Sequence, residues 1–452
     1  MAHVTATGIV SVLAVLGYAW AVRRSLALGC AALLVAGCCL GTHFLTFKVL
    51  SWRLTLDRLA FFALVGAYVM QRALGRTKRQ PSSGPDWALA ALLAVLALSM
   101  FTADWRTPGP GDAKPWWHLY AGYVVPAAVY WIARQSALDE GIVKAVLGTL
   151  LVFGTYLAIT GVLEGTGQSW LVVPRYAADP KQGLAFGCAR GPMLHPVSFG
   201  LYAGVAMLTA WLCASRLHSS ARWLAYAAVP LFLPSLFFTY TRAVWLGAWL
   251  GVFVVLALTL PRRWRGVVLA SMVVGTVCVL TTQWDHLLSF QRGRESAEGT
   301  RHSAYTRLSF TYVSWRMFLD RPWFGLHFGY FSAGKLPYLA DRSTSLDLEA
   351  IRDLCSHNIF LSLLTETGIV GLVLFLTLLL CWARNAWQLW RNPRAPDWAR
   401  MPGAALLGAL GVYAGCWLFH DLTFAPIDHG LLFLLAGIAV GLRRRSDPRA
   451  EA

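Results

Sequence analysis

Long apolar runs recur along this chain, and they limit what it can fold into more than any other feature. The run that follows Asn358 continues for about 22 residues, long enough to cross a bilayer core of about 30 Å. Comparable runs occur throughout the 452 residues, of which 57% are hydrophobic and 13% are charged. Soluble globular chains are less apolar, at about 45–50%. The sequence therefore predicts an all-α, polytopic transmembrane helical bundle.

The apolar runs divide the chain into about 13 predicted spans, or 12 if one N-terminal run is not a true crossing. The first run ends in Arg23-Arg24 with no small-residue cleavage site, so we expect a retained helix and not a signal peptide. Without an internal repeat or a soluble domain, residues 1–452 are expected to form a single integral membrane domain. The predicted spans are 5–22, 26–46, 57–72, 87–104, 117–133, 142–163, 197–214, 223–240, 243–260, 266–283, 358–382, 403–420 and 429–442.

Basic segments between the spans predict the orientation of the bundle. Short loops rich in Lys and Arg stay on the cytoplasmic side of a membrane. The segments that alternate correctly for this side are Arg72–Arg79, Arg216–Arg222, Pro261–Arg265, Arg384–Arg400 and Arg443–Arg445. The C-terminus is therefore expected inside, and the opposite, outer side receives the long loops 164–196 and 284–357.

The large outer loop 284–357 is predicted to contain amphipathic helices. Leu308, Tyr312, Trp315 and Leu319 recur in it at helical spacing on one face. We expect this helix to lie on the membrane surface or to pack over the bundle.

The formal net charge of +17 bears on what the chain binds. No soluble domain offers a basic face with interleaved aromatic residues, so we expect no nucleic acid, and membrane lipids and phosphate groups suit the charge better. We expect no cofactor and no metal. The nine cysteines show no CxxC spacing, and Asp347, Glu349 and Asp353 match no strong ligand pattern.

Arginine and histidine residues gather at the outer ends of the predicted spans. A guanidinium offers a planar donor fork that matches phosphate oxygens and keeps its charge, so such a cluster suits a pyrophosphate-linked lipid. The alternative for Arg190, Arg242 and Arg307 is that they only anchor the chain at the membrane interface. The alternative for Arg316 and Arg321 is that they are solvated loop charges. The residues are Arg190, His195, Arg242, Arg307, Arg316, Arg321 and His357.

His357 stands at the mouth of the predicted span 358–382. On one continuous helix, Gly368 and Gly371 share its face, which suggests that another backbone or a lipid chain comes close. Glu366 points to the opposite face and, at that depth, needs a partner or a proton. A histidine that only reaches toward the interface is the alternative for His357.

Cys188 and Cys355 each lie two residues before a candidate site residue, Arg190 and His357 respectively. Both fall on the side expected to be oxidising, where a disulfide can persist. One hypothesis is a disulfide that holds the two segments together, and the other is that both cysteines keep separate thiols.

Several of these segments resemble the bacterial O-antigen ligase and polymerase superfamily. Arg242 to Leu246 match the R-x3-L motif, and His357-Asn358 with Gly368 and Gly371 match H-[NSQ]-x9-G-x-x-[GTY]. Arg190-Gly191 with His195-Pro196, and Arg307 with the segment 320–329, are similar to further stretches of the family. His327 departs from the family pattern, in which glycine is common, so the loop backbone is expected to differ there.

The resemblance implies an inner-membrane enzyme of about 12 helices, related in architecture to the GT-C glycosyltransferases. It would move a glycan from undecaprenyl pyrophosphate to the lipid A-core oligosaccharide on the periplasmic side. His357 and Arg242 would be catalytic, with Arg190, Arg242, Arg307 and His195 on the pyrophosphate. Asn358, Gly368, Gly371, Arg316 and Glu366 would support them.

Three alternatives remain open at this point. A polymerase of the same superfamily would use a second lipid-linked repeat as acceptor, and a protein O-oligosaccharyltransferase would use a polypeptide hydroxyl. A transporter of lipid-linked glycan belongs to another class. Transporters place interrupted helices at the bilayer midplane, whereas these arginines gather at one face, which favours interfacial chemistry.

Overall fold

The computed structural model describes the chain except residues 1, 42–43, 45, 50–51, 78, 103–113, 184, 215–218, 283–296 and 446–452. The first half contains α1 (Ala2–Arg24), α2 (Leu26–Cys39), β1 (Thr46–Val49), β2 (Trp52–Thr55), α3 (Leu56–Ala73), α4 (Gly84–Phe101), α5 (Pro115–Leu119), η1 (Tyr120–Val124), α6 (Val125–Gln135), α7 (Glu140–Gly165), η2 (Ser169–Leu171), η3 (Arg175–Ala178), η4 (Gly191–Met193) and α8 (Pro196–Ala214). The second half contains α9 (Ser219–Phe237), α10 (Arg242–Thr259), α11 (Arg262–Thr282), α13 (Ala297–Asp320), α14 (Phe331–Gly334), η5 (Leu336–Ala340), η6 (Glu349–Ile351), α15 (Ile359–Arg391), α16 (Asp397–Trp417) and α17 (Pro426–Arg445).

The all-α fold class is confirmed, because every predicted span coincides with a helical segment. Within the described residues, seven helices are long and apolar enough to cross a membrane, namely α4, α7, α8, α10, α11, α15 and α17. The chain is therefore a multi-pass membrane protein, while the count of 12 or 13 crossings stays a prediction. One predicted span is wrong in extent: α2 ends at Cys39, and the β1–β2 hairpin follows where 26–46 was expected to be one helix.

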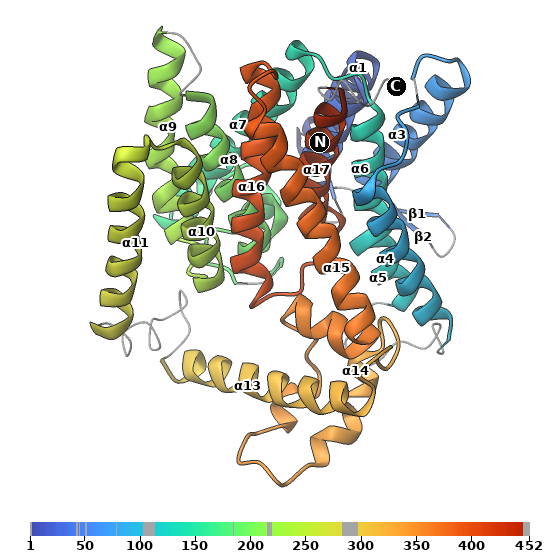
Figure 1. The fold of residues 1–452 in the computed structure, drawn as a ribbon, viewed down its shortest axis with the longest axis vertical. Coiled ribbons are helices and arrows are strands. Elements are labelled where there is room, and N and C mark those ends of the chain that lie inside the picture. Colours follow the sequence, from blue (N-terminus) through green and yellow to red (C-terminus); the bar gives the residue numbers. More distant parts are fainter. Residues whose placement is uncertain are drawn as a thin grey trace.

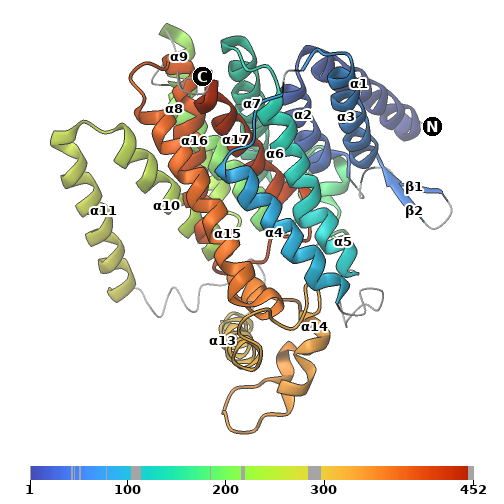
Figure 2. The same cartoon turned by 45° about the vertical axis from the view of Figure 1, so that its right-hand side comes forward.

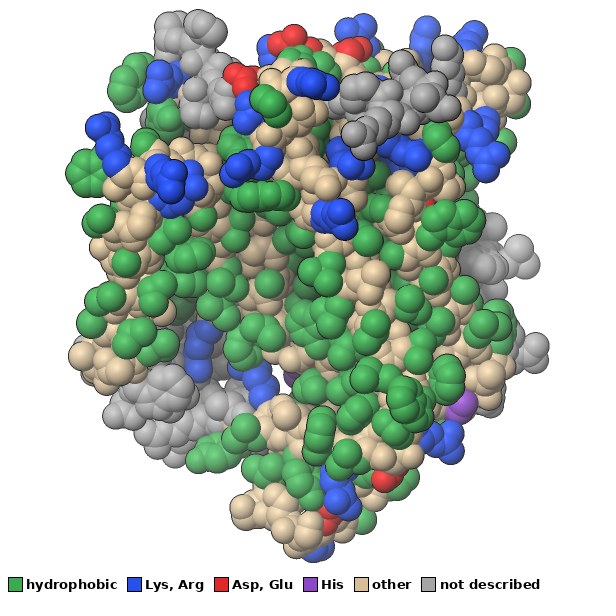
Figure 3. Space-filling view, viewed as in Figure 1, with side chains coloured by type: hydrophobic (Ala, Val, Ile, Leu, Met, Phe, Trp, Pro, Cys, Tyr) green, Lys and Arg blue, Asp and Glu red, His purple; other side chains and the backbone are tan. Residues whose placement is uncertain are grey.

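The long helices run side by side, and α13 lies across one end of them (Figure 1), where a turned view shows it nearly end-on (Figure 2). The helix α17 occupies the centre, since every residue from Asp428 to Leu442 is buried. Lys and Arg side chains gather at the end opposite α13 (Figure 3). We call these two ends the α13 end and the basic end. This separation agrees with the predicted alternation of basic loops.

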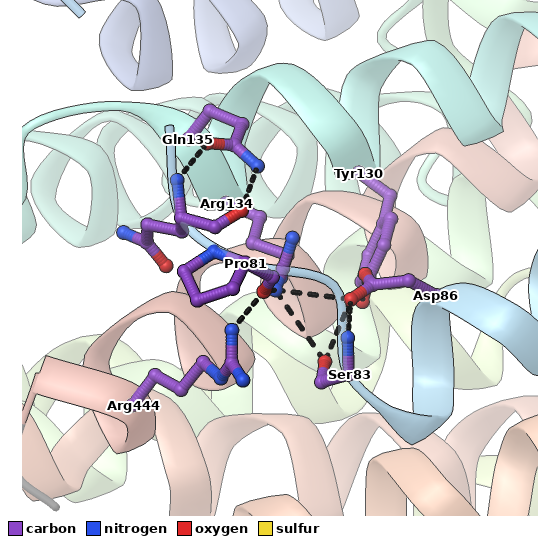
Figure 4. A network of polar contacts seen from close by, with 8 residues as sticks. Pro81, Ser83, Asp86, Tyr130, Arg134, Gln135 and Arg444 are labelled. Carbon is purple, nitrogen blue, oxygen red and sulfur yellow. Dashed lines mark hydrogen bonds and ion pairs between the residues drawn. The ribbon is translucent and has the colours of Figure 1, made fainter. Parts of the chain in front are cut away.

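A buried ion pair ties three helices together at the basic end (Figure 4). The Arg134 guanidinium of α6 lies 2.9 Å from the Asp86 carboxylate of α4, and both side chains are almost fully buried. Tyr130 donates to the same carboxylate at 2.8 Å, and Arg134 donates to the Pro81 carbonyl at 2.7 Å. Arg444, at the end of α17, donates to that carbonyl as well. Removing one partner of such a pair leaves a buried charge uncompensated, so the network holds the register of these helices.

The predicted amphipathic helix of the long loop exists as α13, but its packed face is not the predicted one. Phe310, Val313 and Met317 are buried in a separate apolar cluster with residues of the loop that follows. Leu308, Trp315 and Leu319 are about half exposed instead, and Tyr312 is half-buried. The helix therefore packs over the end of the bundle through its Phe310 side, where Phe310 contacts His357. Contact of the Leu308 face with a membrane surface stays a prediction.

The helix α15 is interrupted at Gly368, whose φ of 65° and ψ of −164° are not helical. The helical-wheel argument that set Gly368 and Gly371 beneath His357 on one continuous helix is therefore wrong. The loop 322–327 occupies the break and pairs with it through the backbone. Leu326 and His327 donate to the carbonyls of Thr365 and Glu366 at 2.8 and 3.0 Å, and the Ile369 amide donates to Pro322 at 2.8 Å.

Two glycines make this contact possible. A Cβ on Gly368 would lie 2.3 Å from the Trp323 carbonyl carbon, and a Cβ on Gly325 would lie 2.4 Å from the Glu366 carbonyl carbon. The close approach of another backbone, one of the two explanations offered for the paired glycines, is thus confirmed at Gly368. Gly371 is blocked by the Thr367 side chain of its own helix.

Replacing Gly325 by Ala is expected to disrupt the docked loop. Gly167→Ala is the matched control, because Gly167 has a similar φ (+78° against +68°) and a Cβ there meets nothing within 4 Å. Both variants carry the cost of a left-handed alanine, about 1 kcal/mol, but only Gly325→Ala must also displace backbone, so we expect about 3 kcal/mol in total. Thermal unfolding in detergent measures the difference. Equal melting temperatures for the two variants would contradict the docking of this loop.

Candidate functional site

Three histidines from distant parts of the chain meet at the α13 end. His357 precedes α15, His420 follows α16, and His195 precedes α8. The ring centroids of His357 and His420 are 6.3 Å apart, and those of His195 and His420 are 6.5 Å apart. We call His195, His357 and His420 the histidine cluster. Its members are half-buried, so the rings are partly open to an incoming ligand.

The helix α13 adds an arginine beside this cluster. The Arg307 guanidinium carbon lies 5.7 Å from the ring centroid of Phe419, the residue before His420. One turn further along α13, the Phe310 ring centroid is 5.2 Å from that of His357. Arg307 and His357 therefore both lie close to the Phe419–His420 segment, and their joint role in one site stays a prediction.

Arg242 is the first residue of α10, and close helix packing carries it to the same end. A Cβ on Gly415 of α16 would lie 2.4 Å from the Gly247 amide nitrogen, so the two backbones touch. The Cys416 thiol lies 3.6 Å from the Ala243 carbonyl oxygen. Because α16 ends at Trp417, its next residues lead directly to His420. The half-buried Arg242 thus lies beside the segment that carries the histidine cluster.

The space-filling view shows a hollow between the bundle and α13. Lys or Arg side chains are visible on its wall, and a His side chain lies at its rim (Figure 3). A hollow at this end of the bundle, with cationic walls, can bind an anionic headgroup while the attached lipid tail lies among the helices.

Arg190 has different partners from those that the sequence predicted. Its side chain is 1% exposed and donates to the carbonyls of Ala177, Asp179 and Gln182, at 3.2, 2.8 and 2.5 Å. The Glu164 carboxylate accepts the amides of Arg190 and Gly191, both at 2.9 Å. These bonds fold the loop 177–191 onto itself. Arg190 is thereby committed to the loop before α8, and not presented to a ligand.

Arg316 also lies away from the cluster. Its guanidinium is 4.0 Å from the Asp341 carboxylate, and its side chain is about half exposed. Hydrogen bonds from Ser343 and Tyr312 lower the pKa of Asp341 to about 2. Nine residues separate Arg316 from Arg307, which puts the two on opposite faces of α13.

Asn358 caps α15 and ties it to the His420 segment. Its side-chain oxygen accepts the amides of Phe360 and Leu361 at 2.9 and 3.0 Å, as an N-cap residue does. Its Nδ2 donates to the Leu418 carbonyl at 2.9 Å. The supporting role expected for Asn358 therefore has a geometric cause, because the same side chain positions both His357 and His420.

Glu366 is buried and accepts the Phe331 amide at 3.2 Å, which supplies the partner that its depth requires. It lines a small cavity with Ser356, Ser362 and Phe424. His327, which departs from the family pattern, keeps a positive φ of 125° that suits glycine better. The Thr102 hydroxyl lies 2.9 Å from its Nδ1, and burial lowers its pKa, aided by the charge of Arg321.

The disulfide hypothesis for Cys188 and Cys355 is wrong in this structure, which joins neither residue in a disulfide. Among the described residues, no group of three His, Cys, Asp or Glu is arranged to hold a metal ion. His420 and Glu164 are the residues that sequence reasoning missed. The signal that singled out His357, a histidine at the outer end of an apolar span, applies equally to His420.

Replacing Arg190 by Gln is expected to loosen the loop 177–191. Three carbonyls lose a charged donor, and we expect a loss of about 2–4 kcal/mol in stability. Arg175→Gln, an exposed arginine just before this loop, is the control and is expected to change stability by about 0.5 kcal/mol or less. Thermal unfolding and proteolysis within the loop measure the effect. An Arg190→Gln protein that is fully stable but does not bind a phosphate lipid would restore the original prediction.

Comparison with known proteins bears on the same end of the molecule. Residues 227–376 match the family model described as O-antigen ligase. No curated protein matches the chain. The matched region contains Arg242, Arg307 and His357, and excludes Arg190, His195 and His420. The match confirms the resemblance seen in the motifs: residues 227–376 are similar to the O-antigen ligase family.

Proposed function

We propose that this protein is an O-antigen ligase that transfers a glycan from undecaprenyl pyrophosphate to the lipid A-core oligosaccharide. The α13 end would face the periplasm, and the basic end the cytoplasm of a cell with an inner membrane. The observation that carries the proposal is that Arg307 and His357 both lie close to the Phe419–His420 segment. Arginine and imidazole together supply the two things that this transfer needs.

The first need is stabilisation of the leaving group. The bond between the anomeric carbon and the pyrophosphate oxygen breaks, and the electron pair leaves with undecaprenyl pyrophosphate. Arg242 and Arg307 neutralise the growing charge on the phosphate oxygens through charge-assisted hydrogen bonds. Partial burial of both arginines strengthens this interaction, since water screens it less.

The second need is a base for the acceptor. An acceptor hydroxyl oxygen forms the new bond to the anomeric carbon, and its proton passes to His357. A neutral imidazole has a free ring nitrogen lone pair that can accept this proton. Attack opposite the leaving group inverts the anomeric centre, and the proposed steps need no metal.

Five of the other predicted residues, His195, Asn358, Glu366, Gly368 and Arg190, act by positioning. His195, whose Nδ1 lies 3.0 Å from the Ser198 hydroxyl, supports His420, and Asn358 links His357 to the same segment. Glu366 and Gly368 hold the break in α15, and Arg190 holds the loop before His195. A mutation at these sites changes the geometry around His357 and leaves the proposed catalytic groups, His357 and Arg242, in the chain.

Loss of either proposed catalytic group should abolish most transfer. We expect Arg242→Gln to lower the rate by about 10²-fold or more, and His357→Ala by about 10²–10⁴-fold. Arg316→Gln is the control, because this exposed arginine lies away from the cluster. The assay is reconstituted transfer from purified lipid-linked glycan to lipid A-core, with protein levels matched. Normal rates in both His357→Ala and Arg242→Gln would remove the mechanism.

The acceptor distinguishes a ligase from a polymerase. In a strain that lacks this protein, we expect lipopolysaccharide with bare core, because no glycan reaches the lipid A-core. Gel electrophoresis of lipopolysaccharide reads this directly. Core capped with a single repeat would identify the protein as a polymerase, and a normal ladder would exclude both reactions.

A further inference from the structure

A second cavity, of about 400 Å³, lies between α2, α3, the segment from α5 to α6, and the loop before α17, and neither Arg242 nor Arg307 lines it. Figure 2 shows α2, α3, α5 and α6 on one side of α17 and α10 on the other. The proposed reaction uses none of the residues that line this cavity. Its size is within the range of small-ligand sites, about 300–1,000 Å³.

The lining of this cavity is amphipathic. One part is apolar, made by Leu33, Leu34, Phe61, Val125, Val129 and Ile427. The other part has polar and aromatic side chains, namely Asp57, Arg58, Trp117, Tyr120 and Tyr176. A ligand that satisfies both parts has a hydrocarbon chain and a polar head.

The polar part has features of a carbohydrate site. The Arg58 guanidinium carbon lies 4.5 Å from the Trp117 ring centroid, so the cavity presents an aromatic ring and a cation next to each other. Oδ1 of Asp57 is buried and accepts no hydrogen bond from the described part of the protein. Buried carboxylate oxygens are normally hydrogen-bonded, so Asp57 is ready to accept a hydroxyl. Sugar hydroxyls donate to carboxylates, and the apolar face of a sugar ring packs on an aromatic ring.

We propose that this cavity binds the acceptor glycolipid, with one hydrocarbon chain among the leucines and valines and a sugar of the head against Trp117, Asp57 and Arg58. This inference rests on the proposed function. We assign the acceptor and not the donor to this cavity, because the Asp57 carboxylate offsets the Arg58 charge and leaves no net positive charge to attract a pyrophosphate. The donor is drawn instead to the side of Arg242 and Arg307, where the lining is cationic.

The cavity approaches the proposed reaction centre at two of its lining residues. Phe424 lines both this cavity and the small cavity that contains Ser356, the neighbour of His357. Met193, two residues before His195, lines the larger cavity from the other side. The His118 ring stacks on Phe424 with centroids 4.6 Å apart and holds this wall in place. A bound head therefore extends along the loop 421–427 toward the histidine cluster.

Two variants test the site by different means. Val129→Phe fills the apolar part, and Asp57→Asn removes the charge of the polar part while keeping its shape. Val152→Phe, on the exposed face of α7, is the matched control for the added ring. With each lipid substrate varied in turn in proteoliposomes, we expect both variants to raise the KM for the acceptor about tenfold, as loss of one strong contact does. The KM for the donor should stay within about twofold of wild type.

The outcomes separate this proposal from the proposed function. A raised KM for the donor would show that the cavity binds the donor and not the acceptor. An unchanged KM for the acceptor in both variants would exclude the cavity as an acceptor site. If Val129→Phe does not fold, Asp57→Asn decides. Photo-crosslinking of wild type with an acceptor glycolipid that carries a photoreactive chain is independent of transfer. Crosslinks in α2 and α6 are expected, and crosslinks confined to other helices would overturn the proposal even for a protein with no transferase activity.

Discussion

The interruption of α15 at Gly368 and the loop that fills it determine much of what happens at the α13 end. A break in a membrane helix frees carbonyls and amides that lipid cannot satisfy. Here the loop 322–327 satisfies them with its own backbone, through the bonds at Thr365, Glu366 and Ile369. The interrupted helix therefore depends on the loop for these hydrogen bonds, and the same bonds hold the loop in place. The short helical segment that begins after His357 takes its direction from this contact, and α13 is held at the other end of the same connection.

The site is assembled by short links that each join two segments. Asn358 caps α15 and reaches the Leu418 carbonyl, so the segments of His357 and His420 cannot separate. Glycine contacts between α10 and α16 bring Arg242 to the end of α16. At the basic end, the pair of Arg134 and Asp86 holds α4, α6 and α17 together. Rigid packing far from the cluster thus keeps its groups in place, as transfer between two bound lipids requires.

Burial separates the arginines into two groups with different uses. Arg134 and Arg190 are almost fully buried and direct their donors at a carboxylate and at backbone carbonyls, which a desolvated guanidinium requires. Arg242 and Arg307 are half-buried at the end that carries the histidine cluster, where a charge retains strength and can still meet a ligand. The same residue type therefore builds the scaffold in one place and offers phosphate recognition in another.

The sequence alone determined the helical membrane fold, the position of nearly every helix and the family. The length of an apolar run and the spacing of a few polar residues are properties of short segments, and they can be read without knowing how distant segments pack. It also marked His357, Arg242 and Arg307, whose residue types suit phosphate and proton transfer wherever they meet. Only the tertiary structure decided that Gly368 receives a loop, that the Leu308 face of α13 is left uncovered, that Arg190 turns inward and that His420 joins the cluster. These outcomes depend on which backbone approaches which side chain across long stretches of chain, and a helical period carries no information about such contacts.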